Sequence, residues 1–150
     1  MDMDDTAAGA FVSPGYLKLC RASGLVLCVV FAAVGVLFLF WPASVAQFFN
    51  TLARNWGLPQ SPIPSPSLYT ALAAAYMYVV TLLALGMYCR PEVRAYSLLL
   101  IQAKSASAVL SIILCFTGVV QIILIINAIV DGAIALGVAH IEFRGRKREG

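Results

Sequence analysis

Apolar residues occupy four long, nearly uninterrupted stretches of this chain, which run approximately over residues 22–41, 68–89, 96–116 and 119–141. Each stretch is close to the ~20 residues that a helix needs to cross ~30 Å of hydrocarbon. A backbone in lipid must satisfy its own hydrogen bonds, so only helices and closed barrels can span it. The runs lack the alternation of barrel strands. We therefore predict an all-α integral membrane protein, a four-helix bundle of four spans.

An extra interfacial helix is predicted between the first two spans, over residues 42–56. Its apolar side chains share one face, and they are Val45, Phe48, Phe49, Leu52 and Trp56. Such a helix can lie flat in the headgroup layer. It can equally cap the mouth of the bundle against its own protein. The Pro-rich residues 57–67 that follow predict an extended linker.

The two ends of the chain differ from the spans in composition. Residues 1–12 are acidic and rich in small residues, which predicts a disordered N-terminal tail. Ser13 and Pro14 form a good helix start, with Ser as the cap and Pro at the first helical position. The membrane domain is therefore expected to cover residues 13–143, and residues 144–150 form a basic C-terminal tail.

Composition leaves no room for a second, soluble domain. The chain has 150 residues, of which 61% are hydrophobic and 11% charged. Soluble domains carry about 25% charged residues. Small residues recur at helical spacing in the first two spans, where they predict faces for close helix packing. These faces are Gly24, Cys28, Ala32 and Gly35 in the first span, and Ala71, Ala74, Ala75 and Tyr78 in the second.

The basic residues flank the membrane rather than forming a nucleic-acid surface, so no nucleic-acid partner is expected. They gather before the first span, between the second and third, and after the fourth: Lys18, Arg21, Arg90, Arg94, Arg144, Arg146, Lys147 and Arg148. Positive residues stay on the cytoplasmic side. We expect a multi-pass protein of the cell membrane with both termini in the cytoplasm. Four of them, Arg144, Arg146, Lys147 and Arg148, are also candidates to contact anionic lipid headgroups.

Two charged residues lie inside the apolar stretches. Lys104 in the third span and Asp131 in the fourth are equally far along the chain from the turn at Thr117–Gly118. In an antiparallel hairpin they would therefore meet at the same membrane depth. A charge at this depth costs about 3 kcal/mol. The pair can avoid that cost by mutual neutralisation, or Asp131 can stay protonated.

Other polar residues fall on the same faces and predict a polar seam. Ser107 and Ser111 share the face of Lys104, while Asn127 and Glu142 share the face of Asp131. The predicted seam runs from the middle of the bundle to the cytoplasmic end, where Glu142 would meet Arg21 of the first helix. Two interpretations stay open: a proton or ion path (or a polar ligand pocket), and an ion pair that locks the helices together.

Other chemistry finds no support in the residues. His140 is the only histidine, which argues against a bis-His haem or a histidine-based metal cluster within this chain. We assign no catalytic residue, no metal ligand and no cofactor.

A family resemblance adds to this interpretation. It is carried by Arg21-Ala22-Ser23-Gly24, by Trp41-Pro42 at the end of the first span, and by Asn127 with Val130-Asp131-Gly132 in the last. In these features the chain resembles the DoxX-like group and related small bacterial four-span membrane proteins. The resemblance implies a four-span fold and a role as an accessory subunit of oxidoreductases, and it implies no functional residue.

The function expected from the sequence is non-enzymatic. We expect an accessory or scaffold subunit that sits in the lipid bilayer and packs against other membrane-protein subunits or against its own copies. The alternative is a small transporter or proton-coupled channel that uses Lys104 and Asp131. A third hypothesis is an intramembrane lipid-binding protein or enzyme.

Overall fold

The computed structural model describes residues 14–61, 68–117 and 121–146. These contain five helices: α1 (Pro14–Phe40), α2 (Pro42–Asn55), α3 (Leu68–Cys89), α4 (Arg94–Phe116) and α5 (Ile122–Arg146). The all-α prediction is therefore confirmed. Several predicted features lie outside the described residues: the tail over 1–12, the cap at Ser13, most of the linker, the turn at Gly118, the first residues of the fourth span, and Lys147 with Arg148.

Four of the helices are long and apolar enough to cross a membrane. The candidate spans are Pro14–Phe40, Thr70–Cys89, Arg94–Phe116 and Ile122–Phe143. Large apolar side chains on them are exposed, such as Leu136 at 74% and Phe116 at 87%. Such exposure fits side chains that face lipid rather than water. The chain is thus a small multi-pass integral membrane protein.

The limits of the helices follow from local chemistry. α1 begins at Pro14, well before residue 22, and α2 begins with Pro42 at its first helical position. A proline at that position loses no hydrogen bond, because the first helical N–H groups have no partner within the helix. Gly57 ends α2 with a φ of 65°. The N–H of Leu58 then donates to the carbonyl of Ala53 at 2.9 Å, a closure typical of helix ends at glycine.

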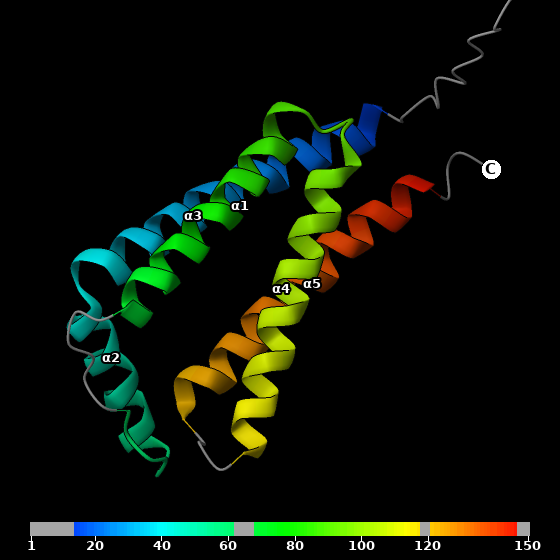
Figure 1. The fold of residues 1–150 in the computed structure, drawn as a ribbon. Coiled ribbons are helices and arrows are strands. Elements are labelled where there is room, and N and C mark those ends of the chain that lie inside the picture. Colours follow the sequence, from blue (N-terminus) through cyan, green and yellow to red (C-terminus); the bar gives the residue numbers. More distant parts are fainter. Residues whose placement is uncertain (1–13, 62–67, 118–120, 147–150) are drawn as a thin grey trace, which may run out of the picture.

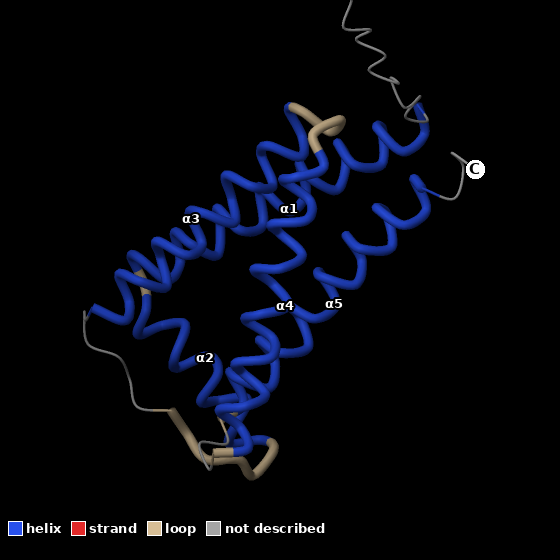
Figure 2. Tube along the Cα trace, turned by 45° about the vertical axis from the view of Figure 1, so that its right-hand side comes forward, coloured by secondary structure: helices blue, strands red, loops and turns tan. Residues whose placement is uncertain are grey.

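The membrane helices form two antiparallel pairs (Figures 1 and 2). In the first pair, α1 packs on α3: Gly24 lies against the backbone of Tyr88, and Gly35 lies against Met77. In the second pair, α4 packs on α5, as their short connection requires. The two pairs meet near the α3–α4 turn and separate towards α2 (Figure 1). We call the end with Pro14 and the α3–α4 turn the basic end, and the opposite end the α2 end.

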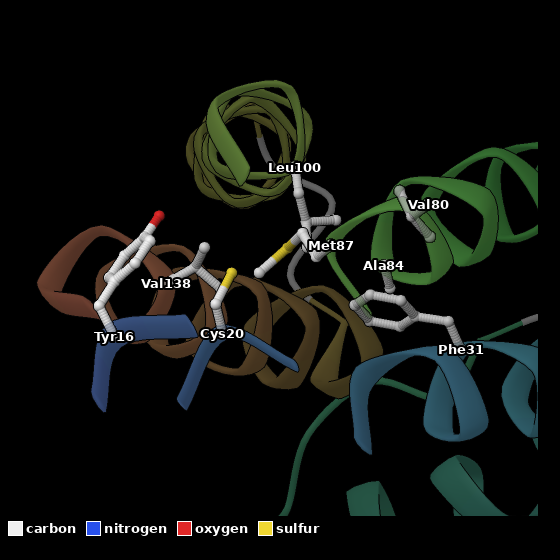
Figure 3. Packing of buried hydrophobic residues seen from close by; sticks show 8 residues of the cluster. All are labelled: Tyr16, Cys20, Phe31, Val80, Ala84, Met87, Leu100 and Val138. Carbon is white, nitrogen blue, oxygen red and sulfur yellow. The ribbon is translucent and has the colours of Figure 1, made fainter. Parts of the chain in front are cut away.

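The apolar core lies where the two pairs meet (Figure 3). Its buried members come from all four membrane helices and are Tyr16, Cys20, Phe31, Val80, Ala84, Met87, Leu100 and Val138. The packing face predicted for the second span was wrong: Tyr78 is 64% exposed, and Ala71 and Ala75 are exposed as well. α3 is rotated relative to the prediction. The close approach of α1 at Gly24 explains the rotation, because it turns the side of α3 that carries Ala84 inwards.

α2 packs against the bundle with one side and exposes part of its predicted apolar face. Its narrow side, with Ala46 and Ala53, is buried against the protein, while Phe48 and Trp56 are 66% and 71% exposed. Asn50 accepts a hydrogen bond from the N–H of Ser61 at 2.7 Å, and the Ser61 hydroxyl reaches Gln121 of the α5 start at 2.9 Å. The helix is therefore tied to the bundle and still presents aromatic side chains outwards.

Candidate functional site

An ion pair lies inside the second helix pair. The ammonium nitrogen Nζ of Lys104 is 2.9 Å from Oδ1 of Asp131. Their side chains are only 1% and 4% exposed. Antiparallel packing of α4 on α5 brings the two residues to one level, because they are equally far from the turn. The structure therefore places these two predicted site residues in direct contact.

Two aromatic rings from the first helix pair cover the ammonium group. The Phe31 ring centroid of α1 lies 4.5 Å from Lys104 Nζ, and that of Tyr76 of α3 lies 5.2 Å away. Both distances allow cation–π attraction, which is strongest where water is excluded. Tyr76 also donates a hydrogen bond to the carbonyl of Ala103 at 3.0 Å. All four membrane helices thus meet at Lys104.

The sequence alone did not connect Phe31 or Tyr76 with the ion pair. The only signal for Tyr76 is that a hydroxyl inside a span needs a hydrogen-bond partner. Phe31 gives no signal, because phenylalanine is common on every face of a membrane helix.

One carboxylate oxygen of Asp131 has no hydrogen-bond donor among the described residues. Oδ2 is buried and accepts no hydrogen bond from the part of the chain that the structure describes. A buried acceptor without a donor costs about 1–3 kcal/mol. Chemically, Oδ2 can accept one further hydrogen bond or a proton.

The amide group of Asn127 continues the polar cluster towards the α2 end. Its Nδ2 donates to the hydroxyls of Ser107 at 3.1 Å and Ser111 at 2.9 Å. This bridge joins α5 to α4 one turn from Asp131. All five predicted seam residues within the membrane, namely Lys104, Ser107, Ser111, Asn127 and Asp131, therefore lie in one cluster, which we call the central cluster.

A second polar cluster surrounds Glu142 at the basic end. The Tyr16 hydroxyl donates to its Oε2 at 2.7 Å, and the Ser97 hydroxyl donates to the same oxygen at 3.0 Å. The Arg94 Nε lies 3.3 Å from Oε1. The four residues come from α1, α4 and α5, and we call them the Glu142 cluster.

The predicted partner of Glu142, Arg21, was wrong. Tyr16, Cys20 and Gly24 are buried because they share the inner face of α1 at spacings of one turn. Arg21 follows Cys20 by one residue, about 100° further round the helix, and is exposed. Arg94 takes the expected role from the start of α4, where its side chain is only one-third exposed.

The continuous seam was also wrong, because apolar side chains separate the two clusters. On α4, Leu100 lies between Ser97 and Lys104 and is fully buried. On α5, Ala135 and Val138 lie between Asp131 and Glu142, at 5% and 3% exposure. Leu100 and Val138 belong to the apolar core in Figure 3. This core forms an apolar plug between the central cluster and the basic end, about two helical turns long on α4 and three on α5.

Two apolar grooves lie elsewhere on the described part of the molecule. One of about 390 Å³ lies between α1 and α5 and includes Val26 and Gly137, and one of about 440 Å³ lies between α1 and α2 and includes Phe38 and Phe48. Both are lined almost wholly by apolar atoms. Neither is lined by Lys104 or Asp131.

Two further predictions concern lipid-headgroup contacts and metal ligands. The backbones of Arg144 and Arg146 belong to the last turn of α5, and the side chains of the predicted headgroup contacts lie outside the described residues. Within the described ranges, no three His, Cys, Asp or Glu side chains are grouped so that they could hold a metal ion.

Comparison of the chain with protein-family models, with curated proteins and with solved structures found no match. The DoxX-like resemblance stays a prediction.

Proposed function

We propose that this protein is a non-enzymatic accessory or scaffold subunit that packs against partner membrane proteins or against its own copies. The observation that supports the proposal is the closed ion pair. Lys104 and Asp131 neutralise each other at 2.9 Å beneath the rings of Phe31 and Tyr76. Polar contacts of this kind hold helices together in lipid, where the hydrophobic effect between helices is lost.

The apolar plug also supports the scaffold function. A path for ions or protons needs polar groups or water on both sides of the charged pair. Here the fully buried side chains of Leu100 and Met87 lie between the central cluster and the basic end. The arrangement favours a rigid unit over a conduit.

The outer faces offer surface for a partner. Ile129 and Leu136 are 66% and 74% exposed on α5, and Val26 is 61% exposed on α1. The lining of the groove between these two helices includes three small residues, Ala22, Ser23 and Gly137. Small side chains let another helix come close.

The orientation that we propose puts the basic end in the cytoplasm. Lys18, Arg21 and Arg90 are exposed there, whereas Arg54 is the only basic residue of α2 at the opposite end. The positive-inside rule then assigns both termini to the cytoplasmic side.

Isolation from native membrane tests the scaffold function. The full chain, tagged at its C-terminus, would be cross-linked in the membrane, extracted in mild detergent and analysed by mass spectrometry and light scattering. We expect a defined assembly with another membrane protein or with further copies. Recovery of the protein as a lone monomer, with and without cross-linking, would overturn the proposal.

A second candidate function is a small proton-coupled transporter, and the orphan Oδ2 of Asp131 favours it. This oxygen can accept a proton without moving Lys104, which binds Oδ1. The test is proton flux into liposomes that carry a pH-sensitive dye and an imposed membrane potential. Asp131→Asn should abolish the flux, with Arg54→Gln as a control. Unchanged flux in Asp131→Asn, or none in the parent protein, excludes the transporter.

A further inference from the structure

The crease between α1 and α3 carries two exposed arginines near its basic end. At the basic end, Arg21 is exposed and makes no ion pair within the described part of the chain, and the same is true of Arg90. Gly24 lies against the backbone of Tyr88. Arg21 precedes Gly24 by three residues and Arg90 follows Tyr88 by two, so both arginines lie near the basic end of the α1–α3 contact. Tyr88 is itself 40% exposed.

Small and apolar residues follow Arg21 along the side of α1 that lies next to α3, and we call this strip the trough. On α1, Arg21, Cys28, Ala32 and Gly35 lie on one helical face, and on α3 the same spacing places Tyr88, Thr81, Met77 and Ala74 opposite them. At the far end, these two faces line a groove of about 240 Å³ that includes Ala32, Gly35 and Met77. Apart from Thr81 and Tyr78, the groove is lined by apolar residues.

The dimensions match one leaflet. Ala32 follows Arg21 by eleven residues, which is ~16 Å along a helix. Half of the hydrocarbon layer is ~15 Å thick. A chain that hangs from a headgroup at Arg21 would reach the near end of the groove at Ala32.

We propose that this crease binds one anionic phospholipid of the leaflet at the basic end. Arg21 and Arg90 would hold the phosphate, and one acyl chain would lie along Cys28 and Ala32. Arginine suits this role because its planar donors match phosphate oxygens. Glu92 is the only exposed acidic residue described near the two arginines, so the local charge favours an anionic headgroup over a zwitterionic one. An acidic protein partner would not use the trough.

Native mass spectrometry of the purified full chain tests the site. Delipidated protein would be titrated with phosphatidylglycerol and, separately, with phosphatidylcholine of the same acyl chains. We expect one tightly held phosphatidylglycerol per copy, and an affinity lower by about fivefold in Arg21→Gln. The matched control is Arg54→Gln, which removes one exposed arginine at the α2 end and should bind as the wild type does. Equal binding by Arg21→Gln and the wild type, or equal loss in both variants, overturns the proposal.

The acyl chain has its own test. Ala32→Phe fills the trough without changing any charge, and it should weaken binding of long-chain phosphatidylglycerol but not of the dihexanoyl form. Equal affinity of the variant and the wild type for the long-chain lipid overturns the placement of the chain. Displacement of the lipid by millimolar inorganic phosphate would show a phosphate site and not a lipid site, which also overturns the proposal.

Discussion

Tyr16 donates a 2.7 Å hydrogen bond to Glu142 and thereby joins the first and last membrane helices across 126 residues of chain. The contact is buried, and it closes the bundle at its basic end. Together with the contact of Tyr76 with Ala103, it is a polar tie between the two helix pairs.

Removal of the Tyr16 hydroxyl should therefore loosen the basic end. We expect Tyr16→Phe to lower the free energy of unfolding by about 1 kcal/mol, because Glu142 loses one donor and keeps two. Equilibrium unfolding in mixed micelles measures the change. Tyr78→Phe is the matched control, since Tyr78 is 64% exposed, and it should change stability by less than ~0.5 kcal/mol. Equal effects in both variants would contradict the structural role of Tyr16.

The central ion pair makes a double-mutant prediction. Lys104→Met or Asp131→Leu alone leaves an uncompensated buried charge and should cost about 3–5 kcal/mol. The double variant removes both charges and should be more stable than either single variant. The same unfolding assay in micelles gives all four stabilities. Additive losses would show that the two residues are not coupled, against the 2.9 Å contact.

Helix approach in the first pair depends on Gly24. A Cβ there would lie 2.7 Å from the backbone nitrogen of Tyr88 and 2.9 Å from the carbonyl oxygen of Ala84. These backbone atoms cannot move without displacing the helix. We expect Gly24→Ala to destabilise the protein by about 1–3 kcal/mol. Gly137→Ala is the control, because its Cβ meets open space, and it should be neutral or slightly stabilising. A neutral result for Gly24→Ala would argue against the close α1–α3 contact.

The proposed orientation can be tested with a native thiol. Cys89 is exposed at the basic end, Cys20 is buried, and Cys28 and Cys115 are half-buried within the spans. In intact cells, a membrane-impermeant maleimide should leave Cys89 unlabelled until the membrane is permeabilised. A Cys89→Ser/Asn55→Cys variant should show the opposite behaviour, since Asn55 is exposed at the α2 end. Labelling of Cys89 from outside the intact cell would show that the orientation is the reverse of the proposed one.

Sequence reasoning succeeded where chain distance alone decides geometry. The four spans follow from length and hydropathy. The contact of Lys104 with Asp131, and of Asn127 with both serines, follows from a short turn and antiparallel packing within one hairpin.

It failed where the answer depends on how a helix is rotated against a non-neighbouring helix. In a soluble protein, a polar face marks the outside, but here nearly every face is apolar. No pattern along the chain therefore indicates that Phe31 covers Lys104, that Arg94 replaces Arg21 beside Glu142, or that Leu100 interrupts the seam.

The distance of 27 residues between Lys104 and Asp131 also sets an order of events during synthesis. Lys104 leaves the ribosome first and reaches the insertion machinery without its counter-charge. At roughly 5–20 residues per second, Asp131 follows about 1–5 s later. Until then, Lys104 is a cation without its counter-charge in the otherwise apolar helix α4. Its release into the bilayer should therefore wait for α5, so that the second hairpin inserts as a single unit.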